Sequence, residues 1–224
     1  MTDDHARPAT LSVAVYGATG LVGSHIAQEL VMRGHSVIGV ARNVSGAIET
    51  PVELVEGTLT DPVLLQTLLR TVNAVVVAIP ALPSNGPAFA DFAGDVLHAV
   101  ADSGVRLGVV GGAGSLWTDA EKSGLVIDSA ELPAAALPSA RAHVALLDAF
   151  LADDSGADWF VLSPPTLFGA RAPGARRNEY RLGDDVVVRR DGEKPTISVE
   201  DYAIAFVDEL ERPRHHRRRF TVGY

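Results

Sequence analysis

The sequence predicts an α/β fold built on a doubly wound, mostly parallel sheet. Short runs of β-branched and aliphatic residues alternate along the chain with longer stripes of helical period, a pattern typical of βαβ units. Several of the short runs are apolar on both faces, as buried parallel strands must be. A glycine-rich turn directly after the first run adds a third, independent indication of this class.

The strands and helices follow one another in regular order. Six strands are expected, at residues 11–17, 36–42, 52–59, 74–80, 106–112 and 158–164. Four helices are expected between them, at about residues 21–33, 62–72, 88–103 and 140–153. In the first helix Leu21, Ile26 and Leu30 lie on one apolar stripe, and Gly34 is placed to cap its end.

The pattern changes between residues 169 and 195, a stretch with glycines, prolines and six arginines. Residues 179–192 predict a hairpin there, and we expect the stretch to form a small C-terminal substrate lobe over the carboxyl edge of the sheet. Ser198 then starts a cap-like S-x-x-D pattern before a further helix, and residues 219–224 are strand-like. We expect residues 1–10 to be a flexible tail and residues 11–224 to form a single domain.

Composition excludes several kinds of site. The 224 residues include no cysteine, which rules out disulfides, thiolate nucleophiles and cysteine-ligated metals. No apolar run reaches the roughly 18 residues of a membrane helix, and the acidic start is unlike a secretory signal. We therefore expect a cytoplasmic protein that binds no membrane and no metal.

Charge is distributed unevenly along the chain. Residues 1–164 hold 7 Lys/Arg and 18 Asp/Glu, a balance of −11, whereas residues 165–224 hold 12 and 10, a balance of +2. We therefore expect anionic ligands to bind more favourably to the last quarter of the chain.

The glycine turn has the spacing of a dinucleotide site. In VYGATGLVGSHI, Gly17, Gly20 and Gly23 lie between the first strand and the first helix. Such glycines permit a tight turn, a close approach of the backbone to a pyrophosphate, and close packing of helix on strand. The free N–H groups at the start of the helix then meet the phosphates. The sequence therefore predicts a Rossmann-type domain that binds NAD or NADP.

The end of the second strand favours NADP(H) over NAD(H). An NAD site usually has an acidic residue there for the ribose 2′-hydroxyl, but this strand ends VARN, with Arg42 and no nearby acid. A guanidinium could bind a 2′-phosphate by charge-assisted hydrogen bonds. The alternative is that Arg42 is a solvated loop cation.

The chain resembles the atypical short-chain dehydrogenases. The resemblance rests on G-x-x-G-x-x-G after the first strand, VEGTLTDP after the third, VVGGAGSL after the fifth, DWFVLSPPTLFG after the sixth, and ISVEDYAIAFVDELERP near the C-terminus. More narrowly, it is similar to the NAD(P)H-binding proteins grouped as NADH-flavin reductases, relatives of biliverdin reductase B. The similarity extends over nearly all residues from 11 to 224.

This resemblance implies a set of cofactor contacts. It places Gly17, Thr19, Gly20, Leu21 and Val22 around the pyrophosphate, Arg42 and Asn43 at the adenosine phosphate, Thr58 and Leu59 in the adenine pocket, Ile79 and Pro80 at the adenosine ribose, Gly112 and Ala113 beside the nicotinamide, and Pro164, Pro165 and Thr166 near its carboxamide. Many relatives end the third strand with Gly-Asp, whereas this chain has Gly57 and Thr58.

The tyrosine that donates a proton in carbonyl-reducing short-chain dehydrogenases is missing from its expected position. Short-chain dehydrogenases that reduce carbonyls carry Tyr-x-x-x-Lys on the helix after the fifth strand, but here the slot falls near SARAH, with Ser139 and His143 at the two positions. A serine hydroxyl is a poor proton donor, and we interpret His143 as a packed or half-exposed helix residue. Flavin reduction needs no such acid, because the charge delocalises over the ring and water can supply a proton.

Four further residues are candidates for the acceptor site. Ser115 could donate a hydrogen bond to the acceptor, although a loop-capping role is an equal alternative. Trp117 and Phe168 could stack on a planar ring, or else fill the core or form a lid. Arg171 could meet a flavin phosphate, and its alternative is a solvated loop cation.

The sequence thus predicts an NADPH-dependent reductase that passes hydride to a flavin, a quinone or a similar planar acceptor. The flavin is expected as a substrate and not as a tightly bound group. The alternatives are a non-catalytic NAD(P)-binding sensor or regulator, and a sugar-nucleotide epimerase or dehydratase. The basic PRHHRRRF tail is short and follows an acidic helix, so nucleic acid is not expected as a partner, and we expect a monomer or a homodimer.

Overall fold

A computed structural model describes residues 9–44, 52–171, 174–190 and 192–224. Its strands are β1 (Ser12–Tyr16), β2 (Ser36–Ala41), β3 (Glu53–Glu56), β4 (Ala74–Val77), β5 (Arg106–Val110), β6 (Trp159–Ser163), β7 (Arg181–Gly183) and β8 (Arg218–Gly223). They form one sheet in the order β3-β2-β1-β4-β5-β6-β8-β7. All neighbouring strands pair in parallel except β7 and β8. The predicted Rossmann-type sheet is therefore confirmed.

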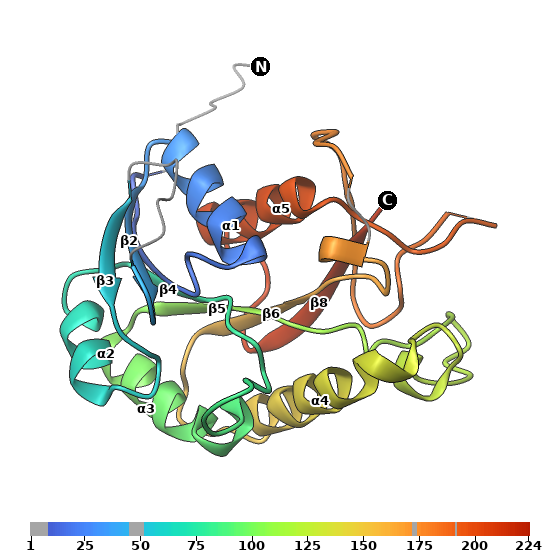
Figure 1. Cartoon of the computed structure of the whole chain (residues 1–224), viewed down its shortest axis with the longest axis horizontal. Helices are drawn as coiled ribbons and strands as arrows, with labels where there is room; N and C mark the ends of the chain where they lie inside the picture. The colour runs from blue at the N-terminus through green and yellow to red at the C-terminus, as the bar shows by residue number, and fades with distance from the viewer. Residues whose placement is uncertain (1–8, 45–51, 172–173, 191) are drawn as a thin grey trace.

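Helices cover both faces of this sheet (Figure 1). The helices are α1 (Leu21–Met32), α2 (Pro62–Leu69), α3 (Ala93–Ser103), α4 (Leu137–Leu151) and α5 (Val199–Glu211). Helices α1 and α5 lie on one face, and α2, α3 and α4 lie on the other. The strand order reverses between β1 and β4, and ligands of such sheets bind in the crevice outside the carboxyl ends of the strands at that point.

Each face has its own apolar core. On the α2–α4 face, Val75, Leu107 and Trp159 are almost fully buried against the helices. On the other face, Phe160 and Phe206 pack with ring centroids 5.0 Å apart. Adjacent residues of one strand, such as Trp159 and Phe160, thus belong to different cores, which explains why β6 is apolar at almost every position.

Two helices start at different residues from those predicted. Helix α3 begins at Ala93, because Phe89–Asp91 form a separate 3₁₀ turn in which the carboxylate of Asp91 accepts a hydrogen bond from the backbone N–H of Ala88. Helix α4 begins at Leu137, with a proline at the second position, where a missing N–H costs nothing. Ser139 therefore lies in the first turn of α4.

The predicted hairpin in residues 179–192 is wrong. Arg181–Gly183 pair antiparallel with β8, and Val186 instead bridges to Trp117. The free edge of β8 offers unpaired backbone groups to β7, so the segment joins the main sheet and does not pair with itself.

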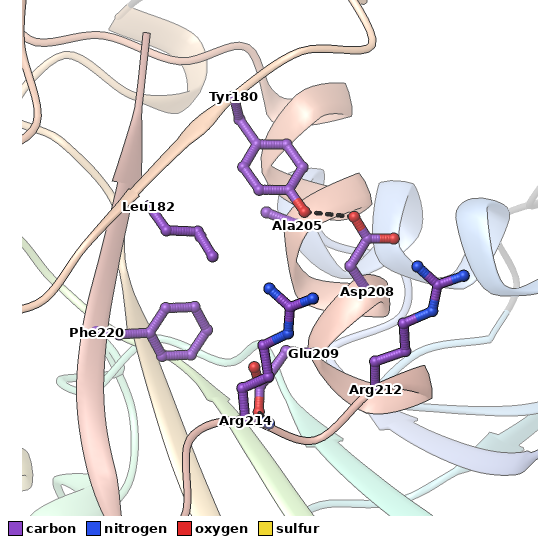
Figure 2. Close-up of a pocket in the computed structure, with 8 residues that line it drawn as sticks. All are labelled: Tyr180, Leu182, Ala205, Asp208, Glu209, Arg212, Arg214 and Phe220. Atoms are coloured by element: carbon purple, nitrogen blue, oxygen red, sulfur yellow. Dashed lines mark hydrogen bonds between the residues drawn. The ribbon is translucent and has the colours of Figure 1, made fainter. Parts of the chain in front are cut away.

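Buried hydrogen bonds attach residues 174–190 to α1 and α5. The fully buried carboxylate of Asp201 accepts hydrogen bonds from the backbone N–H groups of Arg177 and Asn178, at 2.9 Å each, and from the Tyr224 hydroxyl at 2.5 Å. Tyr180 donates a hydrogen bond to Asp208 on α5, as Figure 2 shows. The segment expected to form a substrate lobe is thus anchored by polar contacts and not by a core of its own.

The basic tail is largely paired with acidic side chains. His215 contacts Glu209 at 2.7 Å and stacks on Phe220, and Arg218 contacts Asp184 at 2.8 Å. Arg219 contacts Asp185 at 3.1 Å, so two arginines of the tail are paired with acidic side chains. Within the described ranges, no helix is both long and apolar enough to cross a bilayer.

We predict that Asp201→Ala lowers the free energy of unfolding by about 3 kcal/mol, because it leaves buried N–H donors without an acceptor. Urea denaturation followed by circular dichroism measures the change. Asp184→Ala is the matched control, since the Asp184 side chain is 72% exposed and its loss should cost at most about 0.5 kcal/mol. Equal losses in both variants would contradict the anchoring role of Asp201.

Candidate functional site

The glycine turn between β1 and α1 is shaped by close backbone approaches. Gly17 has a φ of +83°, and a Cβ there would lie 2.5 Å from the carbonyl oxygen of Ala78. A Cβ on Gly23 would lie 2.1 Å from the carbonyl oxygen of Gly17. Real Cβ atoms do not approach so closely, so only glycine allows α1 to start directly against the turn.

The first turn of α1 is open to an anion. Gly20 is its N-cap and has no side chain to accept hydrogen bonds from the following N–H groups. The first turn carries no acidic residue, so the partial positive charge of the helix N-terminus is not neutralised locally. This geometry fits a pyrophosphate.

A cavity of about 340 Å³ opens beside this turn, at the carboxyl ends of β1, β2 and β4. Eight of the residues assigned to the cofactor line it: Gly17, Thr19, Gly20, Arg42, Thr58, Leu59, Ile79 and Pro80. Leu21, Val22 and Asn43 are not among its lining residues. The cavity has the position that an adenosine half of a dinucleotide requires.

Sequence reasoning missed several residues of this cavity. Tyr16, Asn85, Pro87, Phe89 and Phe92 also line it. The Tyr16 hydroxyl is buried without a hydrogen-bond partner in the described part of the chain, and burial raises its pKa. The position of Tyr16 at the end of β1 is a signal of this role. Asn85 and Pro87 come from a loop of no regular pattern, and Phe89 and Phe92 lie at the 3₁₀ turn before α3, where their helical pattern indicated packing.

Arg42 lies at the rim of the same cavity. Its side chain is exposed, and it forms no ion pair with any residue that the structure describes. The hydroxyls of Thr58 and Thr60, which are 2.7 Å apart, belong to residues that line the same cavity. The lining of the cavity thus includes a cation and two hydroxyl groups.

A second cavity, of about 240 Å³, lies at the carboxyl ends of β5 and β6. Six predicted residues line it: Gly112, Ala113, Pro164, Pro165, Thr166 and Phe168. Ser139 and His143 of α4 line it as well, although the sequence assigned them no part in the site. None of its lining residues in the described chain carries an Asp, Glu, Lys or Arg side chain.

His143 is the one titratable side chain of this second cavity. Burial lowers its pKa to about 4, so the imidazole is neutral at physiological pH. A Cβ on Gly112 would lie 2.8 Å from the Cβ and Cγ atoms of His143. The histidine thus fills space that only a glycine at position 112 leaves open.

Two predicted acceptor residues, Ser115 and Trp117, do not line this cavity. A third, Arg171, has a side chain that the structure does not describe. The backbone oxygen of Ser115 accepts a hydrogen bond from Arg219 at 3.3 Å. Trp117 bridges to Leu125 and Val186, with Lys122 over its ring at 5.7 Å.

A smaller hollow of about 120 Å³ lies between α5, β7 and β8 (Figure 2). Leu182 and Phe220 line it together with Asp208, Arg212 and Arg214. It shares no residue with the two cavities above. We therefore place the functional site at the crevice and not here.

A family model described as NAD(P)H-binding matches residues 17–213, from the glycine turn to the end of α5. The chain belongs to this NAD(P)H-binding family. Membership agrees with the glycine turn, which brings α1 close to β1 and leaves the helix N-terminus without a side-chain cap.

Relatives of this NAD(P)H-binding protein cover almost its whole length. YwnB, an uncharacterized protein of Bacillus subtilis, is 35% identical over 214 residues, which are 95% of this chain and 98% of YwnB. A provisionally named epimerase from Bacteroides thetaiotaomicron has a similar structure, with 31% identity, a TM-score of 0.83 and coverage of 96% of this chain and 98% of its own. A provisionally named NADH-flavin reductase from Streptococcus pneumoniae has 26% identity, a TM-score of 0.76 and coverage of 95% and 99%.

In this NAD(P)H-binding chain, Gly23→Ala should lower both stability and cofactor affinity. We expect a loss of about 2 kcal/mol or more in the free energy of unfolding, because the added methyl group overlaps the Gly17 carbonyl. Denaturation and NADPH fluorescence titration measure the two effects.

Gly94→Ala is the control for this prediction. Gly94 also lies in the first half of a helix, but a Cβ there meets no atom within 4 Å. Its replacement should raise stability by about 0.5 to 1 kcal/mol. A Gly23→Ala protein as stable and as tightly binding as Gly94→Ala would refute the packing argument.

Proposed function

We propose that the protein is an NADPH-dependent reductase that transfers hydride to a flavin, a quinone or a similar planar acceptor. The observation that carries the proposal is the pair of cavities at one edge of the sheet, one beside the glycine turn with Arg42 at its rim and one lined almost entirely by apolar or uncharged groups. The family supplies NAD(P)H binding. The relative named as an NADH-flavin reductase supports the choice of reaction.

In this proposal the glycine turn and the ends of β4, β5 and β6 hold the cofactor. Backbone N–H groups at the start of α1 bind the pyrophosphate, and Ile79 and Pro80 cover the adenosine ribose. Gly112 and Ala113 leave room for a flat ring at the end of β5, beside Pro164 and Pro165 of the loop after β6. When bound there, the reduced cofactor supplies a hydride. The chain's contribution is to bring the two rings into contact at about 3 to 3.5 Å.

The lining of the second cavity indicates the class of acceptor. Its polar side chains are Ser139, His143 and Thr166, and none of these is charged at neutral pH. Burying an unpaired carboxylate or phosphate against such a wall costs several kcal/mol. The reacting end of the acceptor is therefore an uncharged ring, whereas a phosphate tail would have to extend into solvent.

The direct test follows NADPH absorbance with purified protein and riboflavin, FMN or menadione, alongside a cofactor titration. We expect binding of NADPH and its oxidation by at least one of these acceptors. Binding without oxidation by any planar acceptor would favour a sensor over a reductase. Absence of NADPH binding would overturn the whole proposal.

For the cofactor preference, we propose that Arg42 binds the 2′-phosphate of NADP(H). Arg42→Ala should weaken NADPH binding roughly 10- to 100-fold, because charge-assisted hydrogen bonds to phosphate contribute about 1.5 to 3 kcal/mol. NADH binding should change less than about twofold. Isothermal titration with both cofactors measures the difference.

Arg70→Ala provides the control, because Arg70 is an exposed arginine at the end of α2 that does not line the cavity. It removes the same charge and should leave both affinities unchanged. Equal losses of NADPH and NADH affinity in Arg42→Ala would contradict the phosphate contact.

A further inference from the structure

The histidines of this protein differ in the hydrogen bonds that their ring nitrogens make. In α1 and α3, the Nδ1 atoms of His25 and His98 lie 2.7 Å and 2.8 Å from the carbonyl oxygens of Leu21 and Gly94, four residues earlier. The Nδ1 atoms of three more histidines contact backbone or side-chain groups: His35, His215 and His216. Among the histidines that the structure describes, only His143 has a buried Nδ1 without a partner.

Like His25 and His98, His143 lies within a helix, where Nδ1 can form a hydrogen bond with the carbonyl oxygen four residues earlier. Its ring does not use the carbonyl of Ser139, four residues earlier, and is packed instead against Gly112 at the wall of the second cavity. An unpaired buried nitrogen destabilises a protein. With the ring proton on Nε2, the buried Nδ1 keeps only a lone pair. The Nε2 atom is not among the buried unpaired atoms and makes no hydrogen bond in the described residues, so it is the ring nitrogen that a ligand in this cavity can reach.

The chemistry of the partner follows from the state of the ring. No carboxylate or cation lines the cavity within the described chain, and burial keeps the pKa of His143 at about 4. A neutral imidazole is a poor source of protons at pH 7, but its N–H group can donate a hydrogen bond to a carbonyl oxygen. Carbonyl groups beside the reducible ring are common to flavins and quinones.

We propose that His143 is a hydrogen-bonding residue of the acceptor site, whose neutral imidazole donates from Nε2 to a carbonyl oxygen of the planar acceptor. This inference rests on the proposed function and deepens it. The bond orients the acceptor over the nicotinamide, and it strengthens as the oxygen gains negative charge during hydride transfer. The serine one turn earlier, Ser139, lines the same wall.

Two substitutions at His143 test the proposal. His143→Leu removes both ring nitrogens, whereas His143→Gln keeps an amide N–H close to the position of Nε2. We expect His143→Leu to lower kcat/KM for the acceptor roughly 10- to 100-fold, with the Kd of NADPH changed less than about twofold. His143→Gln should recover most of this loss.

Thermal denaturation separates this role from a structural one. Because the Nδ1 atom has no partner within the protein, its removal in His143→Leu should leave Tm unchanged or raise it by about 2 to 4 °C. His98→Leu is the matched control: it removes a satisfied, exposed helical histidine and should leave kcat/KM unchanged.

The outcomes distinguish this inference from the function on which it rests. Wild-type turnover with equal kcat/KM in both His143 variants would overturn the role of His143 and leave the reductase intact. A parallel fall of Tm and activity in both variants would also overturn it, because it would show a packing role. NADPH binding without turnover in the wild type would overturn the proposed function, and the role of His143 with it.

Discussion

The close approach of α1 to the end of β1 is the constraint on which the site depends. The contact between Gly23 and the carbonyl of Gly17 lets the helix begin within a few residues of the strand. A longer connection would move the helix N-terminus away from the crevice between β1 and β4. Because that crevice is where the strand order reverses, the same short turn places the N-terminus of α1 beside the first cavity.

Buried polar groups beside the cavities differ in their hydrogen-bond partners from buried polar groups elsewhere. At the opposite, amino edge of the sheet, the buried Arg106 is held by Glu209 at 2.6 Å and Asp158 at 2.7 Å. Asp201 likewise has its partners within the chain. Beside the cavities, Tyr16 and His143 have buried polar atoms without partners in the described residues. Within the described chain, buried polar atoms without partners also occur away from the cavities, at Arg106 Nε and Trp159 Nε1. The lack of a partner therefore points to a ligand only where a cavity lies beside the residue.

The segment after β6 connects these two regions. Its first part supplies Pro164, Pro165 and Phe168 to the acceptor cavity, and the Phe168 ring packs 4.7 Å from that of Tyr202 on α5. Its later part is bound through Asp201 and through Arg176, which contacts Glu29 of α1 at 2.7 Å. Helix α5 thus contacts the wall of the second cavity through the Phe168 ring. Helices α1 and α5 hold the later part of the segment through hydrogen bonds and an ion pair.

Periodicity and glycine spacing determined the order of strands and helices along the chain and the location of the dinucleotide turn, because these depend on neighbours within a few positions. The family resemblance and the end of the second strand added eight residues that line its cavity. Long-range packing decided the rest. Residues 181–183 join β8 because its edge was free, and the loop with Asn85 and Pro87 closes over the first cavity. His143 has a helical pattern indistinguishable from that of a packed residue. Its role depends on whether the ring hydrogen-bonds to a carbonyl of its own helix or lines the cavity. The close packing of Gly112, 31 positions earlier in the sequence, against this ring determines which of the two occurs.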